Sequence, residues 1–119
     1  MIFLLLSLLV VKHFIADFGL QSEYQVSQKN KYGASGGLEH AIVHGVLTMI
    51  ILAAFVEFPP VAVILGVFDG LVHYHIDYIK ARFGTRDANT KLFWFQLGLD
   101  QMCHYIFYIW LVWILNDLL

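Results

Sequence analysis

The chain has 119 residues, of which 60% are hydrophobic and 13% charged, and its formal net charge is −2. Soluble domains are usually about 45–50% apolar and about 25% charged, and a chain this short buries too small a fraction of its surface to hide so much apolar area from water. The composition therefore indicates an integral membrane protein, and the near-neutral charge argues against a nucleic-acid partner. The single cysteine, Cys103, excludes an internal disulfide and a cysteine-rich zinc site.

Four apolar stretches, taken in chain order, predict membrane-spanning helices. They cover residues 1–19, 38–58, 61–79 and 92–118. Each approaches or exceeds the roughly 20 residues that cross the hydrocarbon core, and helix is the structure that satisfies the backbone of such a segment in lipid. The first stretch lacks the basic start and small-residue cleavage site of a signal peptide, so we interpret it as a retained helix. We expect an all-α, polytopic membrane protein: one transmembrane domain over residues 1–119, folded as a four-transmembrane-helix bundle.

The three connections between these stretches predict the orientation of the bundle. Residues 21–37 are polar and end in a Gly/Ser cluster, which is typical of a mobile loop. Basic residues gather in the first and third connections and are missing from the second: Lys29, Lys31, Lys80, Arg82, Arg86 and Lys91. Basic loops stay on the cytoplasmic side. We therefore expect a multi-pass protein of the inner membrane with both termini outside.

Each predicted helix carries one pair of His or Asp residues spaced four apart. The pairs are His13/Asp17, His40/His44, His73/Asp77 and Asp100/His104. This spacing places both members of a pair on one face of a helix. In the predicted orientation all eight fall in the cytoplasmic third of the membrane. We therefore expect them to converge in a polar interior near the cytoplasmic face.

The energy of burial indicates what these residues bind. One Asp at the centre of a membrane helix costs about 2.5–3.5 kcal/mol on the mildest scale. Neutral imidazoles and ionised carboxylates are ligands for divalent metals, and eight such groups suit one or two ions. Zinc is the first choice, with manganese and iron as alternatives. A structural hydrogen-bond network or a proton relay is the competing interpretation, but four pairs at one depth favour metal.

Residues near the predicted site suggest catalytic roles. Glu39 adjoins His40 and could act as a general base, as a Glu does in zinc hydrolases, or could be an interfacial charge. Lys29 and Lys80 border the cytoplasmic end and suit an anionic substrate, although the positive-inside rule alone would place them there. Asp69 continues the face of His73; it either supports the ligands or packs against Lys12.

Four segments of the sequence resemble a family of small bacterial and phage membrane proteins that is catalogued as a domain of unknown function (3307). The segments are HFIADFGLQS (13–22), LEHAIVH (38–44), HYHIDYIK (73–80) and DQMCHY (100–105). The resemblance implies that Gln21, Lys29 and Lys80 are also motif positions. The sequence is more loosely similar to inner-membrane metal-dependent hydrolases with His/Asp-bearing helices, which implies hydrolase activity.

Three functions remain open at this point. The first is a membrane-embedded, metal-dependent hydrolase acting from the cytoplasmic side on a lipid or another phosphorylated, anionic substrate. The second is a divalent-metal transporter or sensor, which the mostly apolar outer halves of the helices disfavour. The third is a structural or partner-binding membrane protein without catalysis. The sequence leaves both a monomer and a homo-oligomer in the lipid bilayer open.

Overall fold

Five α-helices and one π-helical segment make up most of the described chain. The structure is a computed structural model that describes residues 1–116. In chain order the elements are α1 (Ile2–Phe14), the π-helix η1 (Ile15–Leu20), α2 (Glu23–Gln28), α3 (Ser35–Ala53), α4 (Pro59–Phe83) and α5 (Lys91–Leu115). Residues 1–116 contain no strand. The prediction of an all-α fold is therefore confirmed.

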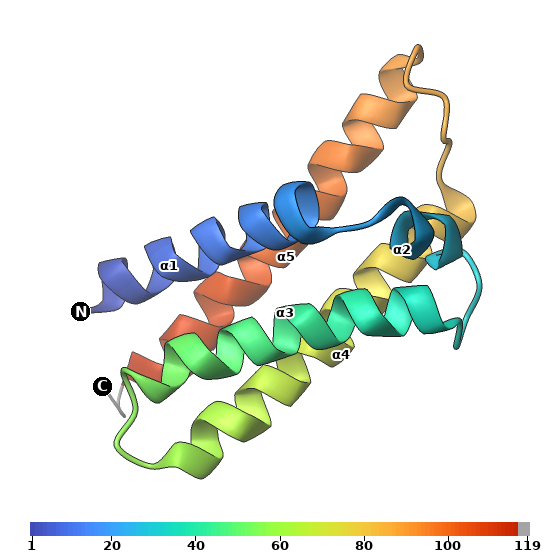
Figure 1. The fold of residues 1–119 in the computed structure, drawn as a ribbon. Helices are drawn as coiled ribbons and strands as arrows, with labels where there is room; N and C mark the ends of the chain where they lie inside the picture. The colour runs from blue at the N-terminus through green and yellow to red at the C-terminus, as the bar shows by residue number, and fades with distance from the viewer. Residues whose placement is uncertain (117–119) are drawn as a thin grey trace.

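α3 and α4 run antiparallel, side by side (Figure 1), and glycines bring their backbones together. A Cβ atom added to Gly45 would lie 2.7 Å from the carbonyl oxygen of Gly66, and a Cβ added to Gly66 would lie 2.7 Å from that of Gly45. Any larger residue at either position would push the two helices apart. Close approach through small residues is the usual packing device of membrane helices, which no hydrophobic force draws together in lipid.

α1 packs against both α3 and α5, and these three helices enclose an apolar core at one end of the molecule. This core contains five fully buried leucines: Leu5, Leu9, Leu52, Leu111 and Leu115. The start of α1, the α3–α4 connection and the end of α5 all lie at this end, whereas α2 and the α4–α5 connection lie at the other (Figure 1). The first half of α5 leans away from the other helices (Figure 1). The bundle is thus closed at its apolar end and splayed at its opposite end.

Three helical segments are long and apolar enough to cross a membrane. They are Ile2–Leu20, Ser35–Ala53 and Pro59–Phe83. α5 has 25 residues but does not meet the same standard of apolarity. Within residues 1–116 the structure is therefore helical, without strands, and has three candidate membrane spans.

The helix ends correct several sequence-based boundaries. α3 ends at Ala53, not 58, and residues 54–58 form the connection to α4. Phe58, which precedes a proline, takes an extended conformation (φ −104°, ψ 99°) that a helix cannot hold. α4 begins at Pro59 because proline is well suited to the first helical turn. It continues to Phe83, one turn beyond the predicted 79, with Lys80 and Arg82 beside its C-terminal carbonyls. The last helix spans 91–115, and residues 117–118 of the predicted 92–118 lie outside the described chain.

The segment 21–37, predicted to be a mobile loop, contains helix α2 and the first turn of α3. Ser22 and Gln25 form a reciprocal capping box that starts α2. Gly36 packs against α2 so closely that an added Cβ would lie 2.9 Å from Cβ of Gln28. The Gly/Ser cluster therefore permits close packing of α2 on α3, where the sequence suggested mobility.

Candidate metal centre

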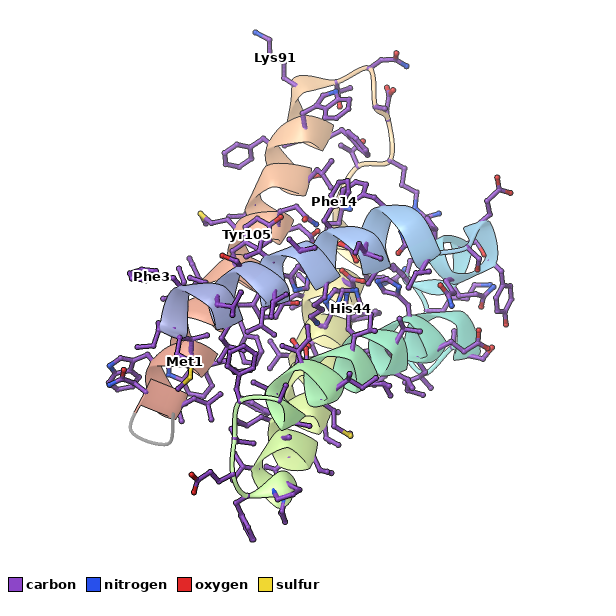
Figure 2. The ribbon with its side chains drawn as sticks, turned by 60° about the vertical axis from the view of Figure 1, so that its left-hand side comes forward. Met1, Phe3, Phe14, His44, Lys91 and Tyr105 are labelled. Carbon is purple, nitrogen blue, oxygen red and sulfur yellow. The ribbon has the colours of Figure 1, made fainter. Side chains whose placement is uncertain are left out.

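The eight His and Asp side chains expected to bind metal lie together inside the molecule. Their candidate ligand atoms form three overlapping groups, each within 4.8 Å: Asp17, His40, His44 and His73; His13, His73 and His104; and Asp77, Asp100 and His104. The five imidazoles are at most 1% exposed. Figure 2 shows His44 enclosed by the helices, whereas Lys91 lies at the far tip of α5. Side chains from α1, η1, α3, α4 and α5 thus meet at one place.

The first group has the spacing that a four-coordinate ion requires. Oδ1 of Asp17 lies 3.1 Å from Nε2 of His40, 3.0 Å from Nε2 of His44 and 3.7 Å from Nε2 of His73. The Nε2 atoms of His40 and His73 are 3.1 Å apart. A tetrahedral ion bound at about 2.0–2.2 Å places neighbouring ligand atoms about 3.3 Å from one another. Three of these four separations lie slightly below that spacing and one lies above it, so the group is close to the size that a tetrahedral ion needs.

Asp17 reaches this position because the chain leaves α-helical geometry just before it. η1 continues α1 without a break but has the wider π-helical turn, and Asp17 lies within it. π-helical turns inside helices occur frequently at functional sites. The turn still lets Oδ2 of Asp17 lie 3.1 Å from Nε2 of His13, four residues earlier. Asp17 can therefore contact His13 on its own helix and the imidazoles of α3 and α4 together.

The third group contains buried polar atoms without hydrogen bonds. Nε2 of His104 lies 3.4 Å from Oδ1 of Asp77 and 3.7 Å from Oδ1 of Asp100. Neither this nitrogen nor the Asp100 oxygen makes a hydrogen bond within residues 1–116. Leaving such atoms unsatisfied costs about 1–3 kcal/mol each. A cation shared by these atoms would satisfy both, so the group fits a divalent metal ion.

Gln101 joins the first and third groups. Its Nε2 donates to Oδ2 of Asp17 at 3.1 Å and to Oδ2 of Asp100 at 3.2 Å, and its Oε1 lies 3.1 Å from Nε2 of His13. Nδ1 of His13 is 3.0 Å from the buried hydroxyl of Tyr108. Gln101 and Tyr108 are not among the site residues predicted from the sequence. The signal available for Gln101 was a polar residue next to Asp100 in an apolar helix.

Behind His44 lies a second, separate polar cluster. Nζ of Lys12 is 2.7 Å from Oδ2 of Asp69, and Thr48 donates to the same oxygen at 2.5 Å. Lys12 also donates to the carbonyl oxygen of His44 at 3.2 Å and lies 3.3 Å from Nδ1 of that ring. The predicted pairing of Asp69 with Lys12 is thus present. Lys12 also links Asp69 to His44, one of the candidate ligands.

Lys12 determines which ring nitrogen of His44 carries the proton. An ammonium group only donates hydrogen bonds, so Nδ1 of His44 accepts from Lys12. A neutral imidazole that accepts at Nδ1 carries its proton on Nε2. Nε2 of His44 is therefore placed to donate to Asp17. In this arrangement His44 orients the carboxylate of Asp17 instead of offering a lone pair to a metal.

The splayed end of the bundle provides a cationic entrance to the cluster. A hollow of about 280 Å³ is lined by Lys29, Lys80 and Arg86, and Asp77 forms part of its wall. Nζ of Lys29 lies 2.6 Å from Oδ2 of Asp77. The two lysines expected at the mouth of the site are thus both present there. Gln21, the third motif position, also lines this hollow.

Glu39 is not part of the cluster. It lies on an exposed position of α3, next to buried His40, and makes no hydrogen bond or ion pair within the described residues. Successive helical residues point in directions about 100° apart, so a residue adjacent to a ligand faces elsewhere. His75 and Cys103 are likewise exposed, and His75 contacts the hydroxyl of Tyr32 instead of the cluster.

Comparison with known proteins gives a family without an assigned activity. No curated protein and no solved structure matches the chain. A family model described as "Protein of unknown function (DUF3307)" matches residues 4–118, which is nearly the whole sequence. The chain therefore belongs to the DUF3307 family.

Proposed function

We propose that the protein is a membrane-embedded, metal-dependent hydrolase that acts on an anionic, phosphorylated substrate or lipid from the cytoplasmic side. The observation that carries this proposal is the convergence of eight His and Asp side chains, drawn from every long helix, next to a cationic hollow. Both parts are required: a place for a metal ion and a place for a negatively charged substrate.

Two sets of side chains would hold the ions. Asp17, His40 and His73 form one set, with His13 and His44 donating to the carboxylate of Asp17. Asp77, Asp100 and His104 form the other. The first set, rich in imidazole, suits zinc, whereas the second, with two carboxylates, also suits manganese or iron.

The chemistry follows from the donor set and its surroundings. A divalent ion held here would polarise an ester or phosphoester and activate water near neutral pH. Lys29 and Lys80 would bind the anionic group of the substrate at the entrance. Lys29 forms an ion pair with Oδ2 of Asp77, and Oδ1 of Asp77 faces His104. Asp77 would thus connect the substrate pocket to the other metal ligands.

Four membrane spans, with α5 as the fourth, give the orientation that supports this proposal. The connections that carry the basic residues lie at the splayed end of the bundle, beside the cationic hollow (Figure 1). Basic connections stay cytoplasmic, so this end would face the cytoplasm and both termini would face outward. Zinc would then enter from the cytoplasm, and the anionic group of the substrate would bind on the same side of the membrane.

The apolar end of the bundle disfavours a transporter. A transporter needs a polar route that reaches both sides of the membrane. In the described chain, the end opposite the hollow is filled by the buried leucines of α1, α3 and α5. An ion in the cluster would have to leave by the mouth through which it entered.

The first test is zinc stoichiometry. The full chain, purified in detergent, is stripped with a chelator, re-equilibrated with zinc and analysed for bound metal. We expect one or two zinc ions per chain, and a loss in His73→Ala, whose ring belongs to two of the three groups. The matched control is His75→Ala, because His75 is exposed and outside the groups. Circular dichroism shows whether both variants fold.

The second test separates a hydrolase from a sensor. Zinc-loaded protein is assayed with p-nitrophenyl phosphate and with p-nitrophenyl acetate. We expect hydrolysis of the phosphate ester to require zinc and to fall in Lys80→Gln, because that substrate is anionic. Stoichiometric zinc without hydrolysis of either ester would favour a metal sensor, and no bound zinc would refute the proposal.

A further inference from the structure

A second hollow lies beside the cationic one and has the opposite character. It is a groove of about 270 Å³ between α4 and α5, lined mainly by apolar side chains such as Ile76, Ile79, Phe83 and Leu99. The lining residues follow helical spacing on both helices, at 76, 79, 80 and 83 on α4 and at 96, 99, 100 and 103 on α5. One face of each helix therefore borders the groove, where α5 leans away from the bundle (Figure 1).

Lys80 belongs to both hollows. Its side chain lines the apolar groove and the cationic hollow, so the two meet along α4. Each hollow also reaches the candidate metal ligands: Asp77 lines the cationic one and Asp100 lines the apolar one. Oδ1 of Asp100 is buried without a hydrogen bond. The two hollows thus share Lys80, and each is bordered by one carboxylate of the His/Asp cluster.

We propose that the substrate is a membrane lipid with an anionic phosphate headgroup, which enters sideways from the bilayer. Its acyl chain lies in the groove between α4 and α5, and its phosphate lies between Lys29 and Lys80. This inference rests on the proposed function and specifies its substrate.

The exposure of the groove favours a lipid over a soluble phosphoester. Ile79 is 57% exposed and Phe83 75% exposed, although both are large and apolar. In a membrane protein such faces lie against lipid tails, so an acyl chain reaches the groove without leaving hydrocarbon. A small soluble phosphoester would fill only the cationic hollow. The apolar groove that joins it at Lys80 would then have no role.

The position of the charges agrees with a headgroup at the membrane surface. Lys80 lies in the last turn of α4, and Arg86 lies in the connection that follows. Long basic side chains at the ends of membrane helices extend toward the headgroup region. A phosphate held there would keep its chains at hydrocarbon depth, where the groove runs.

Photo-crosslinking tests the proposal directly. The full chain is placed in phosphatidylcholine vesicles that contain a small fraction of phosphatidic acid with a diazirine in its acyl chain. After illumination, mass spectrometry identifies the modified residues. We expect insertion at Ile79, Leu99 and Cys103, which line the groove, and far less at Ile109, an equally lipid-exposed residue of α5 outside it. A diazirine-bearing phosphatidylcholine should show no such preference.

Two variants and a competitor complete the experiment. Lys80→Gln should reduce crosslinking in the groove about tenfold, because a hydrogen bond to a charged group contributes about 1.5–3 kcal/mol. Leu99→Trp should block it by filling the groove, whereas Ile109→Trp should not. Glycerol 1-phosphate, which has the headgroup without the chain, should compete only weakly.

The outcomes separate this inference from the proposed function. Equal labelling of Ile109 and Leu99, or equal labelling by the two lipids, would overturn the lipid site even if zinc binds and soluble esters are hydrolysed. Strong competition by glycerol 1-phosphate would assign the site to a soluble phosphoester. Groove-specific labelling in a chain that binds no zinc would leave the lipid site standing and refute the hydrolase.

Discussion

Two buried polar clusters lie next to one another in this bundle, and they differ in how completely they are satisfied. In the first, the ammonium of Lys12 has three nearby acceptors, and Asp69 receives hydrogen bonds from Lys12 and Thr48. In the second, three carboxylates meet five imidazoles, and Nε2 of His104 and Oδ1 of Asp100 are buried without a hydrogen bond.

The difference indicates which cluster stabilises the fold and which is suited to bind a ligand. A buried polar group whose hydrogen bonds are complete needs nothing further, whereas an incomplete buried network is costly unless something completes it. The Lys12–Asp69 pair is therefore structural. The His/Asp cluster has buried oxygen and nitrogen atoms without hydrogen bonds, and such atoms can bind a cation.

The largest expected effect comes from breaking the satisfied pair. Lys12→Met would leave the charge of Asp69 buried without its cationic partner, with only the Thr48 hydroxyl still donating to it, at a cost of about 3–5 kcal/mol. Thermal unfolding in detergent should show a large loss of stability. The double variant Lys12→Met/Asp69→Leu should recover most of it, because removing both charges avoids the unpaired carboxylate. A single variant as stable as the double would contradict a structural role.

A change in the unsatisfied cluster should affect zinc more than stability. Asp17→Asn removes the carboxylate that contacts four imidazoles while keeping its shape. Loss of one charged ligand should weaken zinc binding by about 100-fold or more, since second-shell changes alone cost about 10–100-fold. Competition with a fluorescent chelator measures this. Unchanged zinc affinity would show that Asp17 is not a zinc ligand.

A packing variant should disturb both clusters together. Gly66→Ala adds a Cβ that would lie 2.7 Å from the carbonyl oxygen of Gly45, so α4 must move away from α3. Overpacking of this kind costs about 1–3 kcal/mol. Because α4 carries Asp69 and His73, stability and zinc affinity should both fall. Gly98→Ala is the matched control, since nothing lies within 4 Å of its added Cβ.

The smallest effect is expected at Glu39. The sequence suggested it as a general base, but it is exposed and has no contact with the cluster in the described chain. Glu39→Gln should therefore leave zinc affinity and zinc-dependent ester hydrolysis unchanged within error, as an exposed Glu23→Gln should. A loss of hydrolysis at constant zinc content would restore the catalytic role.

The sequence was sufficient for the four long helices and for the eight converging residues, because both follow from local rules. A spacing of four determines which residues share a helix face, and the cost of burying Asp17, Asp77 and Asp100 requires that they find partners. What it missed depends on contacts between distant segments. Lys12 reaches His44 only in the assembled bundle, and Gln101 bridges two carboxylates from different helices.

The π-helical turn and helix α2 show a second limit. Nothing in IADFGL distinguishes a π-helix from an α-helix. The two differ in that backbone hydrogen bonds join residues five apart in a π-helix and four apart in an α-helix. The Gly/Ser cluster before α3 was interpreted as flexible, although Gly36 is buried against α2. Glycine permits both a loop and close packing, so its role depends on what lies beside it.

The origin of the cluster in separate helices has a consequence for biogenesis. Each long helix contributes one pair, so no segment of the nascent chain can form either proposed ion site alone. Until the last helix joins, the earlier ones carry polar side chains exposed to lipid or to water. α5 brings Asp100, Gln101 and His104, and it follows the other described helices in the chain. Metal bound at the second proposed site would thus report that α5 has been inserted and packed against α4, whereas the first proposed site, built from η1, α3 and α4, does not require α5.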